Sequence, residues 1–370
     1  MLIVEGNYMC RVLGLECKKL GRQLSILFVT LIILVGTSTS VLAQQSLKIY
    51  TWSEYIDPEI VAEFEQEFDV KLDFSYFESD QARDEELAAV AGQGYDLLLI
   101  NSTQVERYGK RGWLEPIDWT AIPNSRFFAP KWTTAFASVD TYAVPYFWGT
   151  MGIAYRKDLI PEGFDTWMEL FKPKQALHDK ILMINDSREL IALALKAAGH
   201  SANSNESSHI SDARDLLLAQ RPYVQQYAYP NILGDSTLLS GDVWVATMYS
   251  GDAMVLQDQD ENIAYSLPEE GGLIWVDYFT VARSSNNKVL AYTFLNFINR
   301  PKIAARLAEW VFYASPNVAA AQLMSAEYIN NEVINPNAGL LKSSEYVQPM
   351  SPRARKKINS SGAELFREFP

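Results

Sequence analysis

Residues 47–68 of this 370-residue chain read LKIYTWSEYIDPEIVAEFEQEF, and this stretch decides the fold. Apolar and polar residues alternate from Leu47 through Ile49, which predicts a β-strand. Asp57 offers a side-chain cap, and Pro58 suits the first position of a helix. The apolar residues that follow recur at helical spacing, at Ile60, Val61, Phe64 and Phe68. A strand that passes through a short turn into a helix predicts an α/β fold.

The turn between this strand and helix, residues 51–55, holds two large aromatic side chains and a carboxylate. In open α/β sheets, ligands bind at the carboxyl ends of the strands, which is where this turn lies. Trp52, Glu54 and Tyr55 together suit an organic cation, through cation–π attraction and charge-assisted hydrogen bonds. Taken alone, the two rings are equally compatible with ordinary core packing.

Strand and helix patterns continue to alternate after this first unit. The sequence predicts a strand at residues 70–74, a helix at residues 80–91 and a strand buried on both faces at residues 95–100. Such alternation predicts a parallel sheet with helices on both sides.

The chain is long enough for two cores, and its pattern divides accordingly. A second α/β unit begins near Thr150, and the chain returns to the first unit after Trp275. We therefore expect an N-terminal lobe of residues 44–149 with 276–319 and a C-terminal lobe of residues 150–275 with 320–370. The polar residues 200–209 predict a surface loop, and residues 356–370 predict a mobile tail.

Residues 1–43 have the pattern of a cleavable signal peptide. Basic side chains at positions 11–22 precede an apolar run of about a dozen residues, too short for a comfortable membrane span. A small-residue cleavage site precedes Gln44, although an uncleaved anchor is the alternative. Both cysteines, Cys10 and Cys17, lie in this segment, so the mature chain has no disulfide. We expect a periplasmic protein.

Charge and motifs exclude several classes of function. The chain has a net charge of −13, and removal of four basic and two acidic residues with the leader leaves −15. That charge repels nucleic acid and anionic membranes. The three histidines, His178, His200 and His209, match no metal-ligand spacing, and the sequence has no phosphate-binding loop or nucleophile elbow. We expect no enzyme activity, no metal and no cofactor.

Aromatic residues and acids recur together at later strand ends, and these segments carry a family resemblance. The relevant segments are TWSEY at 51–55, YD at 95–96, PYFWG at 145–149, DSRE at 186–189, GGLIWVD at 271–277 and YASPN at 313–317. Their order and spacing resemble those of the bacterial spermidine/putrescine-binding periplasmic proteins, from about residue 47 to residue 324. The resemblance implies the type II periplasmic-binding-protein fold, with two α/β lobes joined by crossing strands and a ligand cleft between them.

The same resemblance implies a ligand site. Its aromatic walls would be Trp52, Tyr55, Tyr249, Trp275 and Tyr313. Its polar groups would be Ser53, Glu54, Asp186, Glu189 and Asp277, with Asp252 matching an acid of the putrescine-preferring branch. The chain departs from the spermidine-preferring branch at Tyr249, where that branch has Trp, and at Asn101 and Thr103, where it has Ser and Tyr. The preferred polyamine, whether spermidine, norspermidine or putrescine, therefore stays open.

The resemblance also implies a monomer that presents its closed form to an inner-membrane partner. That partner is either an ABC polyamine importer or a membrane sensor that controls cyclic-di-GMP turnover. The charge-dense residues 77–87 favour the sensor slightly. The alternative function is a two-lobe protein for another solute such as a neutral sugar, which aromatic walls also suit. Three carboxylates in the site argue against a sugar.

Overall fold

The computed structural model describes residues 44–367. The predicted signal peptide, with Cys10 and Cys17, lies outside the described residues. All the elements described below lie in one compact unit that begins at Ser46. Among the described residues, no helix is both long enough and apolar enough to span a membrane.

The strands of the described region form one ten-stranded sheet. They are β1 (Ser46–Thr51), β2 (Lys71–Tyr76), β3 (Leu97–Asn101), β4 (Val144–Arg156), β5 (Ile181–Met183), β6 (Val224–Tyr227), β7 (Val245–Tyr249), β8 (Ile263–Ser266), β9 (Leu273–Val281) and β10 (Glu345–Tyr346). The main path through the sheet is β2-β1-β3-β9-β4-β7-β5-β6, with β10 beside β9 and β8 beside β4.

Helices flank this sheet. Those before β5 are α3 (Pro58–Phe68), α4 (Asp80–Ala89), α5 (Ser102–Lys110), α6 (Pro130–Thr134), α7 (Val139–Tyr142) and α8 (Trp167–Phe171). Those after β5 are α9 (Ser187–Ala197), α10 (Ser207–Gln220), α11 (Thr237–Ser240), α12 (Ser250–Gln259), α13 (Lys288–Ile298), α14 (Pro301–Val311), α15 (Ala326–Asn330), α16 (Ala338–Ser343) and α17 (Pro352–Phe366).

The first strand and helix form for the reasons that the sequence gives. The carboxylate of Asp57 accepts a hydrogen bond from the Glu59 N–H at 2.8 Å, and Pro58 occupies the first turn of α3. Ile60 and Phe64 are completely buried. Asp69 ends the helix in the left-handed conformation, and β2 follows in parallel with β1. The predicted strand, turn and helix are confirmed.

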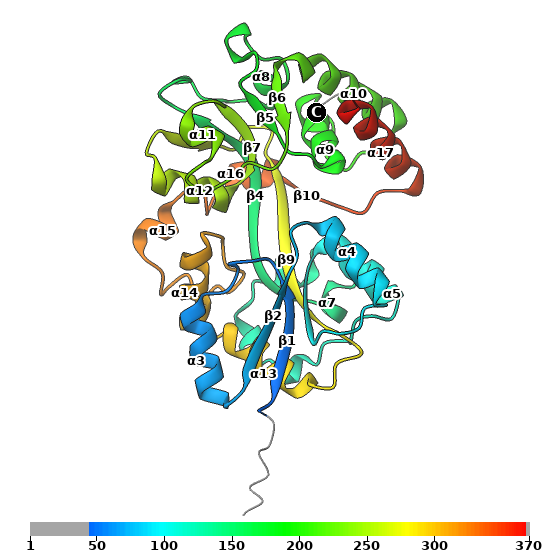
Figure 1. Ribbon diagram of the computed structural model, residues 1–370, viewed down its shortest axis with the longest axis vertical. Helices are drawn as coiled ribbons and strands as arrows, with labels where there is room; N and C mark the ends of the chain where they lie inside the picture. The colour runs from blue at the N-terminus through cyan, green and yellow to red at the C-terminus, as the bar shows by residue number, and fades with distance from the viewer. Residues whose placement is uncertain (1–43, 368–370) are drawn as a thin grey trace, which may run out of the picture. The chain divides into compact units, whose positions relative to one another are not determined.

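Strand direction changes where the chain passes between the lobes. β1 is parallel to β2 and β3, and β5 is parallel to β6 and β7, as predicted. In contrast, β9 is antiparallel to both β3 and β4. The prediction of a parallel sheet is therefore wrong for the crossing strands. The chain leaves the first lobe along β4 and returns along β9, so the two run in opposite directions (Figure 1).

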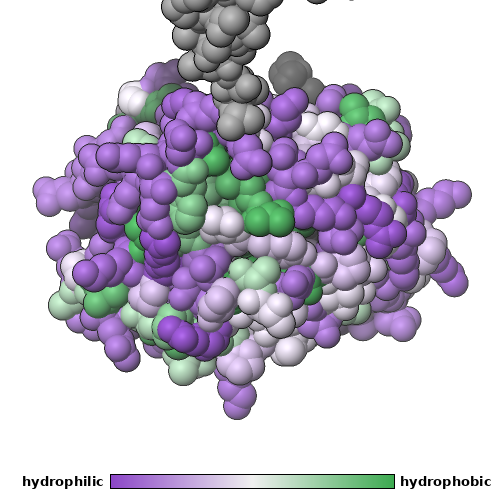
Figure 2. All heavy atoms as spheres, turned by 90° about the horizontal axis from the view of Figure 1, so that it is seen from below, coloured by the Kyte–Doolittle hydropathy of each residue, from purple (hydrophilic) through white to green (hydrophobic). Residues whose placement is uncertain are grey.

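Each lobe has its own hydrophobic core, which confirms the predicted two-lobe α/β fold. The first core draws on residues between Leu47 and Trp148 and on residues between Ile274 and Ile334. The second draws mainly on residues between Met151 and Leu273 and on α17. The end of the molecule seen in Figure 2 is mainly hydrophilic, with a few small apolar patches. The exact lobe boundaries stay a prediction. Tyr328 and Ile334, which belong to the segment 320–370 predicted for the C-terminal lobe, pack in the first core.

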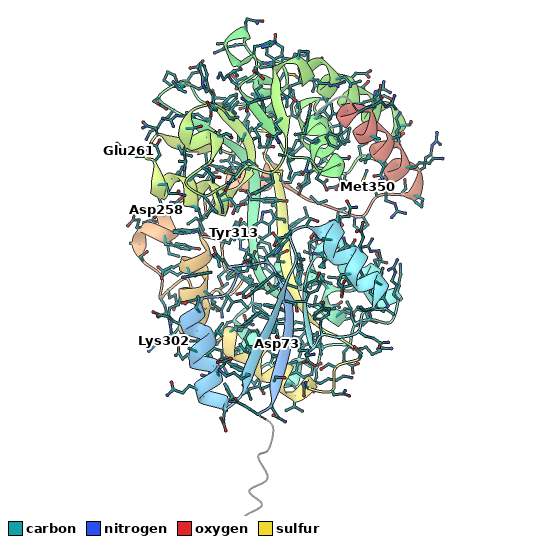
Figure 3. The ribbon with its side chains drawn as sticks, in the orientation of Figure 1. Asp73, Asp258, Glu261, Lys302, Tyr313 and Met350 are labelled. Atoms are coloured by element: carbon teal, nitrogen blue, oxygen red, sulfur yellow. The ribbon has the colours of Figure 1, made fainter. Side chains whose placement is uncertain are left out.

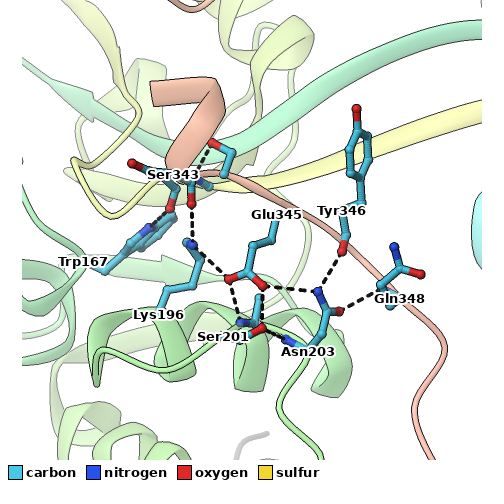
Figure 4. Close-up of polar contacts among 12 residues, drawn as sticks. Trp167, Lys196, Ser201, Asn203, Ser343, Glu345, Tyr346 and Gln348 are labelled. Atoms are coloured by element: carbon cyan, nitrogen blue, oxygen red, sulfur yellow. Dashed lines mark hydrogen bonds and ion pairs between the residues drawn. The ribbon is translucent and has the colours of Figure 1, made fainter. Parts of the chain in front are cut away.

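Besides the crossing strands β4 and β9, the segment around β10 contacts both lobes. The buried Lys196 of α9 donates hydrogen bonds to the Ser343 carbonyl at 2.9 Å and to the Glu345 carboxylate at 3.2 Å (Figure 4). The Ala202 N–H donates to the same carboxylate at 2.9 Å. The neighbouring Tyr346 ring packs edge-on against Phe136 of the first core, with the ring centroids 5.4 Å apart. This segment therefore ties the second lobe to the first beside the crossing strands.

Two predictions for polar segments are wrong. Residues 200–209 are not entirely loop, because α10 begins at Ser207. Residues 356–370 are not a mobile tail, because α17 extends to Phe366 and packs on α9 and α10. Ile358 and Leu365 of this helix are buried. A Cβ atom at Gly362 would lie 1.8 Å from the Ser187 hydroxyl oxygen, so the helices approach closely there.

The burial of α17 predicts that it stabilises the second lobe. Ile358→Ala removes a side chain that is 1% exposed and should lower the unfolding free energy by about 2–4 kcal/mol. Asn359→Ala, at an exposed position of the same helix, is the matched control and should change it by less than about 0.5 kcal/mol. Urea unfolding measures both. Equal, small effects of the two variants would show that α17 does not pack on the lobe in solution.

Candidate ligand-binding site

Asp277 of β9 is the most deeply placed acid of the predicted set. It is 8% exposed, and the hydroxyl of Tyr55 donates a hydrogen bond to its carboxylate at 3.0 Å. Tyr55 is itself buried, and its carbonyl accepts a hydrogen bond from the Tyr146 hydroxyl at 2.8 Å. Burial raises the pKa of Asp277 to about 7, helped by the charge of Asp80 and opposed by the Tyr55 hydrogen bond. The turn after β1 thus positions a tyrosine on the acid of β9.

Glu189, in the first turn of α9, forms a second acidic position. Asp186 caps this helix and accepts hydrogen bonds from the N–H groups of Arg188 at 2.8 Å and Glu189 at 2.9 Å. The hydroxyl of Tyr249, at the end of β7, donates to both carboxylate oxygens of Glu189, at 3.0 and 3.2 Å. The pKa of Glu189 is raised well above its ordinary value by loss of solvation and then by the charge of Asp186.

Asp252, in the first turn of α12, forms a third acidic position. The Tyr313 hydroxyl donates to its carboxylate at 3.2 Å, and the Tyr229 hydroxyl donates to the other oxygen. Loss of solvation raises the pKa of Asp252, although both hydrogen bonds lower it. Tyr313 belongs to the first core, so its bond to Asp252 joins the two lobes. A Cβ atom at Gly251 would lie 2.3 Å from the Tyr313 ring, so glycine permits this contact.

Trp275 lies between the second and third acidic positions. Its ring meets the Tyr313 ring edge-on at a centroid distance of 4.6 Å and the Tyr249 ring at 5.9 Å. The ring centroid of Tyr249 lies 5.5 Å from that of Tyr229. Gly149 of β4 makes room for the indole, because a Cβ atom there would lie 2.6 Å from it. A continuous set of aromatic rings therefore links Glu189 to Asp252.

The remaining candidates lie at the margin of this group. Trp52 is half-buried and packs against Phe77, with the ring centroids 4.3 Å apart. Ser53 and Glu54 are exposed in the turn, and within residues 44–367 no hydrogen bond or ion pair joins either side chain to another candidate. Asn101 caps α5 and accepts a hydrogen bond from the Thr103 hydroxyl at 2.6 Å. Contact of any of these residues with a ligand stays a prediction.

The structure adds two residues that the sequence did not single out. Tyr229 follows β6 and donates to Asp252. Asp80 follows β2, and its charge raises the pKa values of Asp277 and Glu189. Both lie beyond the carboxyl ends of strands, which is the signal that could have found them. The sequence pattern does not predict β6, and Asp80 belongs there only to the charge-dense residues 77–87.

The arrangement suits a cationic ligand better than a catalytic reaction. Each of the three acidic positions is bound by at least one tyrosine hydroxyl and faces aromatic rings. Carboxylate oxygens have further lone pairs that can accept hydrogen bonds from ammonium groups. No group of three or more His, Cys, Asp or Glu side chains that could hold a metal ion occurs in the described part of the chain.

The fold and the site define a two-lobe solute-binding protein, and comparison with known proteins gives its family. The family model of bacterial extracellular solute-binding proteins matches residues 59–336. The chain therefore belongs to this family and is a binding protein, not an enzyme.

Individual relatives point in the same direction. The chain is 31% identical over 323 residues to the putrescine-binding periplasmic protein PotF of Escherichia coli K12, covering 82% of this chain and 86% of that one. It is 28% identical to the spermidine/putrescine-binding periplasmic protein of the same organism, covering 81% of this chain and 86% of that one. A crystal structure of the spermidine/putrescine ABC transporter substrate-binding protein PotD from Streptococcus pneumoniae superposes with a TM-score of 0.79 at 25% identity. That match covers 88% of this chain and 99% of PotD.

The raised pKa of Asp277 predicts how stability depends on pH. An aspartate has a pKa of about 4 in an unfolded chain, whereas that of Asp277 is about 7 in the folded protein. The folded protein therefore holds this proton more tightly, and the unfolding free energy falls as the pH rises between these values. Asp277→Asn cannot ionise, and its amide oxygen can still accept the hydrogen bond from Tyr55.

Without ligand, Asp277→Asn should melt several degrees above the parent protein at pH 8 and close to it at pH 4.5, as measured by scanning calorimetry. Asp73→Asn is the control, because Asp73 is exposed on β2 and lies away from Tyr313 (Figure 3). A difference in melting temperature that is the same at both pH values would show that Asp277 does not titrate in this range.

Proposed function

We propose that this chain is a periplasmic polyamine-binding protein. It binds a linear polyamine of the spermidine, norspermidine or putrescine class between its lobes and presents the closed form to an inner-membrane partner. The observation that carries this proposal is the set of three acidic positions, Asp277, Glu189 and Asp252, each bound by a tyrosine hydroxyl. They lie around Trp275 and its aromatic neighbours.

The chemistry of the site fits a flexible chain with separated positive charges. An ammonium group donates hydrogen bonds to a carboxylate, each contributing about 1.5–3 kcal/mol. A desolvated ammonium over an aromatic face gains about 2 kcal/mol more. The methylene segments between amines would lie along the rings of Trp275 and Tyr249. Because the acidic positions belong to different elements, a ligand with several amines satisfies them better than a compact monovalent cation.

The curated relatives support this ligand class. PotF is named for putrescine binding, and its Escherichia coli counterpart for spermidine and putrescine. This chain shares the acid at Asp252 with the putrescine-preferring branch and departs from the spermidine-preferring branch at Tyr249, where that branch has tryptophan. We therefore leave the preferred chain length to measurement.

We propose that the partner is an inner-membrane ABC permease. The Streptococcus pneumoniae neighbour is named as the substrate-binding protein of such a transporter. Part of the charge-dense segment 77–87, on which the membrane-sensor alternative rests, is engaged within the protein. Arg83 is 1% exposed and bonds to Asp80, and Asp84 accepts from Arg107 and Tyr108. Glu78, Glu85 and Glu86 of this segment are exposed, so a membrane sensor stays the alternative partner.

A neutral sugar is the competing ligand. Aromatic rings would stack on a sugar ring, and carboxylates would accept hydrogen bonds from its hydroxyls. A sugar, however, brings no positive charge to compensate acids whose pKa the protein has raised. This difference makes the two ligand classes separable by experiment.

Titration calorimetry of the purified protein, stripped of ligand, tests the proposed function. We expect one-to-one binding with a dissociation constant of about 1 μM or tighter for at least one of putrescine, cadaverine, norspermidine, spermidine and spermine. Affinity should fall as salt is added, because charge pairs contribute to it. Glucose and maltose serve as neutral controls. Absence of binding to all five amines, or tight binding of a sugar, would overturn the proposal.

A further inference from the structure

We propose that Asp80, at the start of α4, is a further ligand-contacting residue of this site and recognises the additional amine that a triamine has and a diamine lacks. This inference rests on the proposed function. It concerns which polyamines the site prefers, and it uses an acid outside the set that the family resemblance implies.

The position of Asp80 follows from the sheet. Asn101 of β3 and Asp277 of β9 are directly opposite each other in an antiparallel pair. Residues paired in this way project their side chains to the same face of the sheet. The side-chain amide of Asn101 donates a hydrogen bond to the Asp80 carboxylate. Asp80 is therefore held on the same side as Asp277, one side chain away from it.

Asp80 also faces the second lobe. Its charge raises the pKa values of Glu189 and Tyr249, which belong to α9 and β7. The charge of Asp186 in turn raises the pKa of Asp80. These mutual effects require short separations, because charge interactions through water weaken within about 10 Å. Asp80 thus lies near both the acid of β9 and the acids at the start of α9.

The carboxylate of Asp80 has capacity left for a ligand. One oxygen accepts from the Arg83 guanidinium at 2.6 Å and the other from Asn101. Each carboxylate oxygen can accept two hydrogen bonds. The Asp80 side chain is 44% exposed, whereas the Arg83 side chain is 1% exposed. The cation therefore lies behind the carboxylate, and the open side of the carboxylate is free to accept an N–H from a ligand.

The arrangement gives the site an ordered series of acids. Tyr313, which donates to Asp252, lies 6.1 Å in centroid distance from Tyr55, which donates to Asp277. Asp277 is paired with Asn101, which donates to Asp80. A diamine has two ammonium groups and can use two of these positions. A protonated triamine brings one more charge, for which Asp80 supplies the extra acceptor.

A purely structural role for Asp80 is the alternative, because Arg83 is buried and needs a counter-charge. Asp80→Asn tests this, since the amide keeps the shape and one acceptor oxygen. If the single variant loses stability, the double variant Asp80→Asn with Arg83→Met replaces it in the test, because it removes both charges together. The Asp73→Asn variant controls for the loss of a surface charge, because Asp73 is exposed on β2.

The experiment compares the affinities of norspermidine and spermidine with those of putrescine and cadaverine by calorimetry. We expect Asp80→Asn to weaken triamine binding by about tenfold or more and diamine binding by less than about threefold, whereas Asp73→Asn changes neither. The double variant should show the same selective loss. Equal losses for both classes, or no loss, would overturn the role of Asp80.

The outcome for the parent protein separates this inference from the proposed function. If the parent protein binds no polyamine, the proposed function fails and the role of Asp80 fails with it. If the parent protein binds polyamines and Asp80→Asn leaves the ratio of triamine to diamine affinity unchanged, only the role of Asp80 is refuted.

Discussion

The antiparallel pairing of β4 with β9 is the constraint on which both lobes and the site depend. Every residue of β4 from Val144 to Ala154 is buried, and β9 is buried along almost its whole length. These two strands carry the chain out of the first lobe and back into it. Their pairing places Gly149 against Trp275 and Asp277 opposite Phe147, and the further pairing of β9 with β3 places Asp277 opposite Asn101. The crossing strands therefore hold Trp275 and Asp277 of the candidate site, whereas its residues Tyr55, Tyr229 and Tyr313 come from turns and loops.

Burying acids beside these strands costs free energy of hydration, and the proposed function would recover this free energy on ligand binding. A carboxylate surrounded by protein loses hydration, and tyrosine hydroxyls recover only part of it. The pKa of Asp277 rises to about 7 for this reason, and those of Glu189 and Asp252 also rise. An ammonium group that enters the site restores the lost interaction. Under the proposed function, much of the gain on binding would therefore come from reversing the loss of hydration that these acids carry without ligand.

Local patterns in the sequence predicted much of the fold, and the failures have physical causes. The cap at Asp57 and the buried run at residues 97–100 depend on nearby residues only, so they could be read directly. α17 was missed because its many polar residues resemble a tail. Its buried residues recur at Ala354, Ile358, Ser361 and Leu365, on one helical face, and gain their stability only from α9 and α10.

The candidate site was predictable as a set of residue types at strand ends, but not as a set of partners. The bonds from Tyr55 to Asp277 and from Tyr313 to Asp252 join residues 222 and 61 positions apart. No local pattern carries that information. Asp80 illustrates the same limit, because the sequence places it only in the charge-dense residues 77–87. Its contact with Asn101 depends on the strand order β2-β1-β3, which brings the start of α4 to the end of β3.

The most direct test of this account measures the protons exchanged when a polyamine binds. Calorimetry in buffers of different ionisation enthalpy, repeated at pH 6, 7 and 8.5, gives that number. Because an ammonium ligand favours the ionised carboxylate, binding should release protons at pH 6 and release fewer as the pH passes the Asp277 pKa of about 7. Binding with no proton release at any of the three pH values would contradict the central claim that desolvated acids receive the ligand.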